Sequence, residues 1–461
     1  MVFGGANMNF ALGATEYKAP FVLLSSGNHL IGLNFVQFSH DTIVISGPNV
    51  TGNRIEDCSL GYGCPLLAID GCGRDGIVLE NGTHDNIIEG NQILDSGGNG
   101  IRISGEGTDR NILVGNYLGQ LSIDTAVVCN VDVDEIDVPT PLVPVDGVCD
   151  FGHILDAFHD FQSKSTEANA KECVLIEAGA SDNIVGGVGR EYANFIAGPN
   201  WVFNYVLASE GSTTNLLKSS DKVSVSGSGV VIDGVGTAGN QVLGNYIGYR
   251  NIAAIAYNNE DNKYYMYPKR SRAGLSKSSI VLRNGASNNT IGSNEVAGRN
   301  RIAYSSGDAV VIEGAETTAN RVINNYIHSE ANGVTIRDGA NNNRIGEATS
   351  LTNLISAANY GIDILGAGSS NNTVYRNEIR GNGFSGVSIH EGATDNIIGG
   401  PGEGEANNIT LNDSDGVVVY DAGTENNVIS GNIITSNGEI GVFFAGGATA
   451  NIIGGTTEGS G

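Results

Sequence analysis

Residues 386–399 read Gly386-Val-Ser-Ile-His-Glu-Gly-Ala-Thr-Asp-Asn-Ile-Ile-Gly, and the pattern of this stretch returns along the chain. Its anchor is an Asn, then one residue, then Ile or Val. The steps between the anchors from residue 279 to residue 455 are 31, 23, 29, 24, 31 and 24, so long and short steps alternate. A repeat of this length predicts a solenoid. The anchors are Asn289, Asn320, Asn343, Asn372, Asn396, Asn427 and Asn451.

The repeat predicts short strands rather than helices. Each unit contains runs rich in Val and Ile with alternate residues apolar, and Gly, Asn, Asp and Ser separate these runs. Strands that return after every unit satisfy their backbone groups by pairing with the equivalent strand one coil away, at about 4.8 Å. We therefore expect a parallel β-helix with a column of apolar side chains inside. The repeated Asn side chains are expected to form a ladder at a turn position, where Asn tolerates the left-handed backbone conformation.

The same pattern reaches the N-terminal part of the chain. Asn28, Asn53, Asn86 and Asn111 are separated by 25, 33 and 25 residues, and Asn183 and Asn240 follow. Together with the later anchors they predict an all-β chain that forms a single domain over residues 1–461, with about 13 coils and a length of about 60 Å. A solenoid grows by adding coils and needs no second core.

Three phrases carry a resemblance to a known family. Asn111-Ile-Leu-Val-Gly-Asn-Tyr-Leu-Gly, Asn240-Gln-Val-Leu-Gly-Asn-Tyr-Ile-Gly and Asn396-Ile-Ile-Gly-Gly resemble the right-handed parallel β-helix repeats of the pectate-lyase-like group of secreted and cell-surface proteins. The resemblance covers nearly the whole chain and implies the right-handed fold. It does not imply one function, because the group includes polysaccharide lyases, sugar epimerases, adhesins, tailspikes and spacers. The chain has no Asp-Pro-His phrase like that of β-helix mannuronan epimerases and no Trp-Ile-Asp-His phrase like that of pectate lyases, so no catalytic residue is carried over.

Three neighbouring steps are much longer than the others, at 72, 57 and 49 residues. They indicate insertions at residues 120–172, 188–228 and 249–277. The first and third insertions follow the same phrase, Gly-Asn-Tyr-Leu-Gly or Gly-Asn-Tyr-Ile-Gly, so we expect the insertions to leave one corner and form a lateral lobe. Function in repeat proteins usually resides in such loops.

The insertions contain the candidate site residues. An irregular calcium site is one interpretation of three acidic residues, although an EF-hand is excluded because the required glycine is missing; these are Asp132, Asp134 and Asp137. Aromatic and basic residues are candidates for glycan binding, or alternatively fill the seam with the rod and pair with the acidic insertion; these are Trp201, Tyr205, Tyr265, Tyr267 and Arg272. Proton abstraction from a uronic-acid polymer needs a cation and a base, for which the candidates are His159, Lys164, Lys269 and Arg270.

Charge and cysteine usage limit the partners and the location. The formal net charge of −26 opposes any general affinity for nucleic acid. No apolar run is long enough to predict a membrane span. The six cysteines lie within the first 173 residues, and their even number predicts disulfides in an exported protein. We expect a bridge between Cys129 and Cys149, and at least one pair among Cys58, Cys64 and Cys72; a metal site is the alternative, but there is no Cys-x-x-Cys pair.

These observations favour an extracellular or cell-surface structural β-helix that contacts glycans or cations, calcium among them, through its lobe. The alternative is a lyase or epimerase that acts on an acidic polysaccharide. The last repeat stops in mid-coil after Asn451, and residues 4–10 resemble its missing continuation. Two interpretations follow: end-to-end stacking of copies into a filament, or an excerpt of a longer repeat protein whose neighbouring coils complete the pairing.

Overall fold

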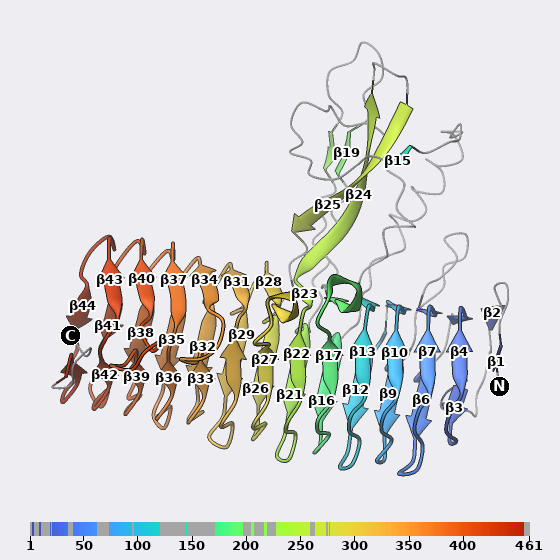
Figure 1. Ribbon diagram of the computed structural model, residues 1–461, viewed down its shortest axis with the longest axis horizontal. Helices are drawn as coiled ribbons and strands as arrows, with labels where there is room; N and C mark the ends of the chain where they lie inside the picture. Colours follow the sequence, from blue (N-terminus) through green and yellow to red (C-terminus); the bar gives the residue numbers. More distant parts are fainter. Residues whose placement is uncertain are drawn as a thin grey trace.

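The computed structural model describes most of the chain in atomic detail. The described residues are 19, 21–35, 40–61, 73–94, 96–119, 171–196, 227–248, 275 and 277–455, and the backbone of seven further strands is described as well. Three long sheets run side by side along the molecule, as expected for a β-helix of about 13 coils (Figure 1). Every strand in these sheets pairs in parallel with the equivalent strand of the next coil.

Sheet A has fourteen strands: β1 (Val2–Phe3), β4 (His29–Ile31), β7 (Arg54–Glu56), β10 (Ile87–Glu89), β13 (Ile112–Val114), β17 (Ile184–Gly186), β22 (Gln241–Leu243), β27 (Thr290–Gly292), β30 (Arg321–Ile323), β33 (Arg344–Ile345), β36 (Thr373–Val374), β39 (Ile397–Ile398), β42 (Val428–Ile429) and β45 (Ile452–Ile453).

Sheet B has thirteen strands: β2 (Asn9–Phe10), β5 (Asn34–Phe35), β8 (Ser59–Leu60), β11 (Gln92–Ile93), β14 (Tyr117–Leu118), β18 (Phe195–Ile196), β23 (Tyr246–Ile247), β28 (Arg301–Ala303), β31 (Tyr326–Ser329), β34 (Asn353–Ala357), β37 (Asn377–Arg380), β40 (Asn408–Thr410) and β43 (Ile433–Thr435).

Sheet C also has thirteen strands: β3 (Phe21–Leu23), β6 (Ile43–Ser46), β9 (Ile77–Glu80), β12 (Ile101–Ser104), β16 (Val174–Glu177), β21 (Val230–Asp233), β26 (Ile280–Arg283), β29 (Val310–Glu313), β32 (Val334–Arg337), β35 (Ile362–Leu365), β38 (Val387–His390), β41 (Val417–Val419) and β44 (Val442–Phe444). Two short 3-10 helices, η3 (Arg190–Tyr192) and η4 (Val296–Gly298), lie in turns between sheets A and B.

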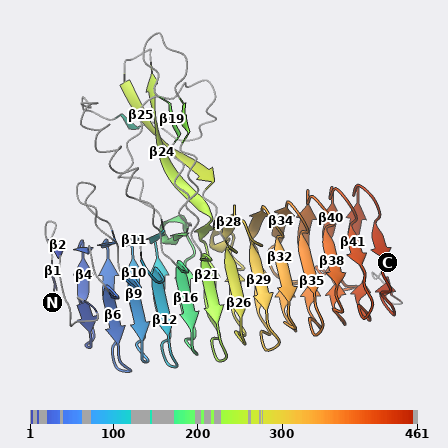
Figure 2. The same cartoon turned by 180° about the vertical axis from the view of Figure 1, so that it is seen from behind.

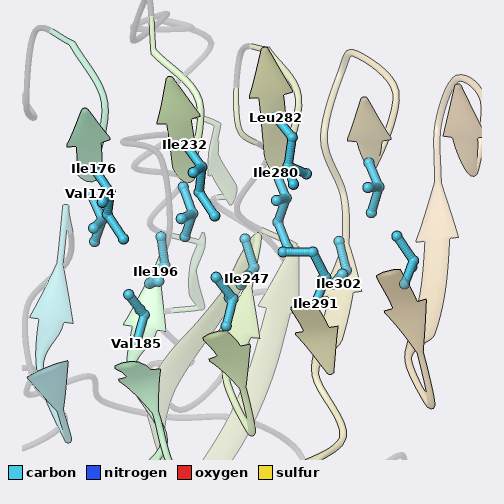
Figure 3. Close-up of a cluster of buried hydrophobic side chains, with 14 of the residues drawn as sticks. Val174, Ile176, Val185, Ile196, Ile232, Ile247, Ile280, Leu282, Ile291 and Ile302 are labelled. Carbon is cyan, nitrogen blue, oxygen red and sulfur yellow. The ribbon is translucent and has the colours of Figure 1, made fainter. Parts of the chain in front are cut away.

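The core is one continuous apolar column inside the three sheets. Side chains from successive coils point inward and meet in the space between the sheets, as Figure 3 shows for Ile176, Ile232, Ile247 and Ile291. These four residues are fully buried. The column follows from the alternation of the strands, since residues separated by two positions point to the same face.

The expected Asn ladder is confirmed. All thirteen anchors from Asn28 to Asn451 belong to it, and in each coil the backbone N–H and the side-chain amide both donate to the Oδ1 atom of the next anchor. The side-chain contacts measure 2.8 to 3.3 Å. The amide also donates to a backbone carbonyl, as from Asn320 to Ala286 at 2.9 Å. The amides therefore join each coil to its neighbours.

The prediction that the ladder asparagines themselves adopt the left-handed backbone conformation was wrong, because that conformation belongs to the preceding residue. None of the ladder residues has a positive φ; the residue immediately before each of them does, as in Asp85, Asn342 and Asp395 at 55°, 54° and 56°. Gly, Asn and Asp fill most of these preceding positions because they tolerate this conformation. The ladder residues are selected for their amide, and the residues before them for their backbone.

A second Asn ladder was not predicted from the sequence. Ten further asparagines form a ladder at the corner that leads into sheet B, in which each side-chain amide donates to the Oδ1 atom of the next; they are Asn91, Asn116, Asn194, Asn245, Asn300, Asn325, Asn353, Asn377, Asn407 and Asn432. A third ladder joins Asn382, Asn412 and Asn437.

The turn between sheets A and B explains why long and short steps alternate. From the first ladder to the second the chain takes 5 residues at Asn320–Asn325, but 11 at Asn289–Asn300 and 11 at Asn396–Asn407. Short and long turns alternate from residue 289 onward, whereas the strands keep their register. The alternation is therefore a property of one corner of the coil.

Cys58 is not part of the expected pair among Cys58, Cys64 and Cys72, and a bridge between Cys64 and Cys72 stays a prediction. Cys58 is a free, buried thiol, Cys173 is also buried, and no disulfide is present among the described residues. Cys58 is 1% exposed, and its backbone N–H donates to Asn91 Oδ1 at the start of the second ladder. Burial raises the pKa of this thiol to about 11, although backbone hydrogen bonds lower it. Cys64, Cys72, Cys129 and Cys149 lie outside the described residues.

The insertions are described only by their strands. β24 (Tyr249–Asn258) and β25 (Lys263–Arg272) form an antiparallel hairpin, to which β15 (Val143–Pro144) adds a third strand. β19 (Asn204–Val206) pairs with β20 (Leu216–Lys218). These strands lie on the same side of the rod in both views (Figures 1 and 2). β18 belongs to sheet B, so the second insertion begins after Ile196 rather than at residue 188. The single lobe stays a prediction.

No helix among the described residues is long and apolar enough to cross a membrane.

The ladder makes a prediction about stability. Replacing Asn343 by Ala removes the acceptor for both donors of Asn320 and the donor to the Thr317 carbonyl. We expect the free energy of unfolding to fall by about 2 to 4 kcal/mol, because buried donors are left unpaired. The matched control is Asn342→Gly, since Asn342 is exposed and has a positive φ that Gly adopts freely. Urea unfolding of the two variants measures the difference; equal losses would contradict a special role for the ladder amide.

Candidate functional site

The site residues predicted from the insertions divide into two groups. Six of them lie outside the described residues: Asp132, Asp134, Asp137, His159, Lys164 and Trp201. The others lie on strands of known backbone position: Tyr205 on β19, and Tyr265, Tyr267, Lys269, Arg270 and Arg272 on β25. The structure places the five residues of β25 together on one strand, with Tyr265 paired to Ala256 and Pro144, whereas Tyr205 belongs to a separate pair of strands. The calcium, glycan and catalytic roles assigned to these residues remain predictions.

The described part of the rod contains a polar cluster that the sequence interpretation missed. It lies on the outer face of sheet C, where β35, β38 and β41 are neighbours. Leu365 is paired with His390, and Tyr420 follows β41 with its N–H donating to the Ile389 carbonyl. Residues on the outer face of successive strands are stacked along the rod at about 4.8 Å per coil. Side chains far apart in the sequence therefore meet here.

His390 is the centre of the cluster. Its Nε2 atom lies 3.1 Å from Asp363 Oδ1, and its ring is stacked on that of Tyr420, with 4.7 Å between centroids and 8° between planes. His390 is 8% exposed and Asp363 is 5% exposed. A buried carboxylate is stabilised only when it has hydrogen-bond partners or an opposite charge, and His390 supplies both when protonated.

A chain of hydrogen bonds holds Asp363 from the other side. Its Oδ2 atom accepts from the Asn332 amide at 3.2 Å, so its two oxygens have different partners. The Asn332 amide also donates to the Thr335 hydroxyl at 3.3 Å, and that hydroxyl donates to Asp308 Oδ2 at 2.8 Å. The chain crosses four coils, from β29 to β38, and fixes the carboxylate of Asp363 toward His390.

The electrostatics favour a charged imidazole. Burial lowers the pKa of His390, but the hydrogen bond and the charge of Asp363, together with Glu391 and Asp421, outweigh burial and raise the pKa above its ordinary value. Burial, followed by the neighbouring Tyr360, raises the pKa of the Tyr420 phenol. At neutral pH Tyr420 is therefore a neutral hydrogen-bonding group, and His390 carries a proton more often than a free imidazole does.

Aromatic side chains surround the buried polar groups. Phe384 is 50% exposed and Phe443 is 40% exposed. Phe443 is paired with Val418, in the same outward row of sheet C as Asp363 and Ser388. The Tyr360 ring packs against Phe384, with 5.5 Å between centroids. The outer face therefore combines buried hydrogen-bonding groups with exposed flat apolar surfaces. This combination is typical of ligand sites, where a few polar groups fix orientation and apolar groups supply contact area.

Another aromatic cluster lies on sheet B, at the coils that carry the insertions. Tyr117, Phe195 and Tyr246 stack face to face, with centroids 5.1 and 5.0 Å apart, and the Arg301 guanidinium lies 5.1 Å from the Tyr246 ring. Tyr246 is only 4% exposed. The stack therefore presents little free ring surface and is better understood as packing between the coils.

A signal for the sheet C cluster was present in the sequence. The outward position of sheet C is Val in many coils, as in Val231, Val281 and Val311, but it is Thr335, Asp363 and Ser388 in three consecutive coils. The change from apolar to polar at one register position marks the site. No group of His, Cys, Asp and Glu side chains among the described residues is arranged to hold a metal ion.

Comparison with known proteins agrees with the fold. Residues 299–457 match the family model described as right handed beta helix region. No curated protein matches the chain in sequence. Among solved structures, the chain is similar to the Dettilon tailspike protein with 13% identity and a TM-score of 0.42, over 92% of this chain and 61% of the tailspike. The chain thus spans about three fifths of the tailspike's length.

Two epimerase structures are similar at the same level. The periplasmic alginate epimerase AlgG has 12% identity and a TM-score of 0.34, over 91% of this chain and 76% of AlgG. The A-module of the Azotobacter vinelandii mannuronan C-5 epimerase AlgE4 has 9% identity and a TM-score of 0.35, over 95% of this chain and 83% of the module. Similarity this low gives no argument about ligand or activity.

The His390–Asp363 contact makes a prediction about pH. Because folding raises the pKa of His390, its stabilising effect is complete below the ordinary pKa of His and is lost as the pH rises through the folded value. Unfolding by urea between about pH 6 and pH 9 should therefore show stability falling with pH. His390→Gln should remove this part of the slope and cost about 1 to 3 kcal/mol at the acidic end. His328→Gln is the control, since His328 contacts Ser356 and Tyr304; an unchanged slope in His390→Gln would refute the assignment.

Proposed function

Because the chain is a right-handed parallel β-helix protein, we propose that it binds a glycan chain along the outer face of sheet C, around Asp363, His390 and Tyr420. We propose an extracellular or cell-surface location for this role. The observation that carries the proposal is the cluster itself: buried hydrogen-bonding side chains from adjacent coils with exposed aromatic rings beside them. Sugars present hydroxyl groups to the former and apolar ring faces to the latter.

The shape of the face supports a chain-like ligand rather than a compact one. The polar row extends without interruption over the coils from β29 to β38, through Asp308, Asn332, Thr335 and Asp363. Each coil repeats the preceding one at about 4.8 Å, so a linear polymer laid along the rod meets equivalent positions in succession. Binding of this kind gains from several modest contacts rather than from one deep pocket.

The protonation states at the site suit binding. A charged His390 donates a hydrogen bond, the neutral Tyr420 phenol donates or accepts one, and the Asp363 carboxylate is held in place by Asn332. The polysaccharide lyase or epimerase remains an alternative proposal for the insertions, where Lys269 and Arg270 lie on β25. A screen of acidic polysaccharides for unsaturated products tests that alternative.

The glycan proposal is tested by binding. The intact chain is titrated by calorimetry with oligosaccharides from several polysaccharide classes, and at least one class should bind. Phe384→Ala should weaken that binding about tenfold, because it removes an exposed ring beside the site. Tyr326→Ala is the matched control, since Tyr326 is a 40% exposed aromatic residue on sheet B. No binding in any class, or equal losses in the two variants, would overturn the proposal.

We propose a second role, in assembly, from the last coil. Its strands β43, β44 and β45 each pair on one side only within the described part of the chain. Several apolar side chains are exposed at this edge, namely Ile433, Ile440, Phe443, Ile452 and Ile453. An open strand edge is a template for further pairing. Another coil, from a second copy stacked end to end or from a longer chain, would cover it.

Electron microscopy tests the assembly role. Copies that stack end to end should form fibres whose axial repeat is about 60 Å, the length of about 13 coils. The proportion of fibres should rise with protein concentration, and Ile433→Lys should reduce it, because Lys at a strand edge opposes pairing. Dispersed short rods at every concentration would exclude self-assembly.

A further inference from the structure

We infer that the glycan bound on the outer face of sheet C is neutral or carries amino groups, and that polymers of uronic acid are excluded from this face. This inference rests on the proposed glycan-binding function and specifies its ligand class. It follows from the charges that surround the cluster and from the partners that those charges already have.

The outer face between β29 and β44 is strongly acidic. Carboxylates on the strands and in the flanking turns outnumber the cations, which among the described residues of this face are Arg337 and a protonated His390. The carboxylates include those of Asp308, Glu313, Asp338, Asp363, Glu391, Asp415 and Asp421. Three of them, in Asp363, Glu391 and Asp421, act on His390 strongly enough to raise its pKa. A ligand at the cluster therefore meets a negative potential.

Both cations are already paired. Arg337 donates twice to the Glu313 carboxylate, at 2.9 and 2.6 Å, and lies 3.7 Å from Asp338. His390 is bound to Asp363 at 3.1 Å, and its other nitrogen lies 3.8 Å from Glu391. Within the described residues of this face, no cation is left to neutralise a carboxylate of the ligand. Recognition of a uronate requires such a charge, which is usually supplied by Arg or Lys.

The acids, by contrast, have acceptor capacity to spare. Asp308 accepts from the Thr335 hydroxyl and the Asn332 N–H, and Asp415 accepts from the Ile440 N–H at 3.0 Å. A carboxylate provides about four acceptor positions, so each of these groups can take further donors. Sugar hydroxyl groups are such donors, and an ammonium group adds an opposite charge.

The experiment compares three oligosaccharide probes of similar length by calorimetry: chitosan oligomers, their N-acetylated counterparts and oligogalacturonates. The intact chain should bind the first two, and the oligogalacturonate should bind at least about tenfold more weakly. Added salt should weaken binding of the chitosan oligomer and leave the N-acetylated one unchanged, because only the former depends on charge. Asp308→Asn should reduce the preference for the chitosan oligomer, whereas Glu378→Gln, on sheet B, should not.

The outcomes separate the two proposals. If no probe or other glycan binds, or if Phe384→Ala has no effect on binding, the proposed function fails. If the oligogalacturonate binds as tightly as the N-acetylated oligomer and Phe384→Ala weakens that binding, the function stands and the inference about ligand class is overturned. Equal effects of Asp308→Asn and Glu378→Gln would also overturn it, since the selectivity would then come from the net charge of the chain rather than from this face.

Discussion

The structure depends on buried Asn side-chain amides whose hydrogen-bond partners lie in the neighbouring coils. The ladder asparagines inside the rod are fully or nearly fully buried, and a side-chain amide transferred from water without partners costs several kcal/mol. Its Oδ1 atom accepts from the preceding coil, and its amide donates to the following coil. The requirement repeats at two corners along the rod and at a third in part of it. The regular coil provides these hydrogen-bond partners, and the apolar column fills the space that the coil encloses.

Much of this fold could be predicted because the repeated coil of a solenoid produces a repeated pattern in the sequence. The thirteen anchors from Asn28 to Asn451 were recognised, and all of them belong to the first ladder. The second ladder was missed although Asn91, Asn116 and Asn245 follow their anchors by five residues. The second ladder has no constant offset from the first, because the turn between sheets A and B is 5 residues long in some coils and 10 or 11 in others. The cysteine count predicted a pair among Cys58, Cys64 and Cys72 but could not say which two, and Cys58 lies unbridged in the core beside Asn91.

The candidate site could not be recognised from the repeat pattern alone. The insertions depart from the period and contain unusual residues, but His390 lies inside one of the most regular repeats. Its partners are 27 residues away at Asp363 and 30 residues away at Tyr420. Only the strand register shows that these residues lie on the same face of sheet C in adjacent coils. In a β-helix, functional residues are recognised by comparing the same outward position across coils, rather than by local motifs.

The direction of the ladder has a consequence for how such a chain is made. Every anchor donates toward the coil that follows it in the sequence, so Asn343 completes its hydrogen bonds only when Asn372 is in place. During synthesis the most recent coil always holds amides whose acceptors have not yet been translated. The newest coil therefore always presents the same row of N–H donors at its open edge, whichever coil it is.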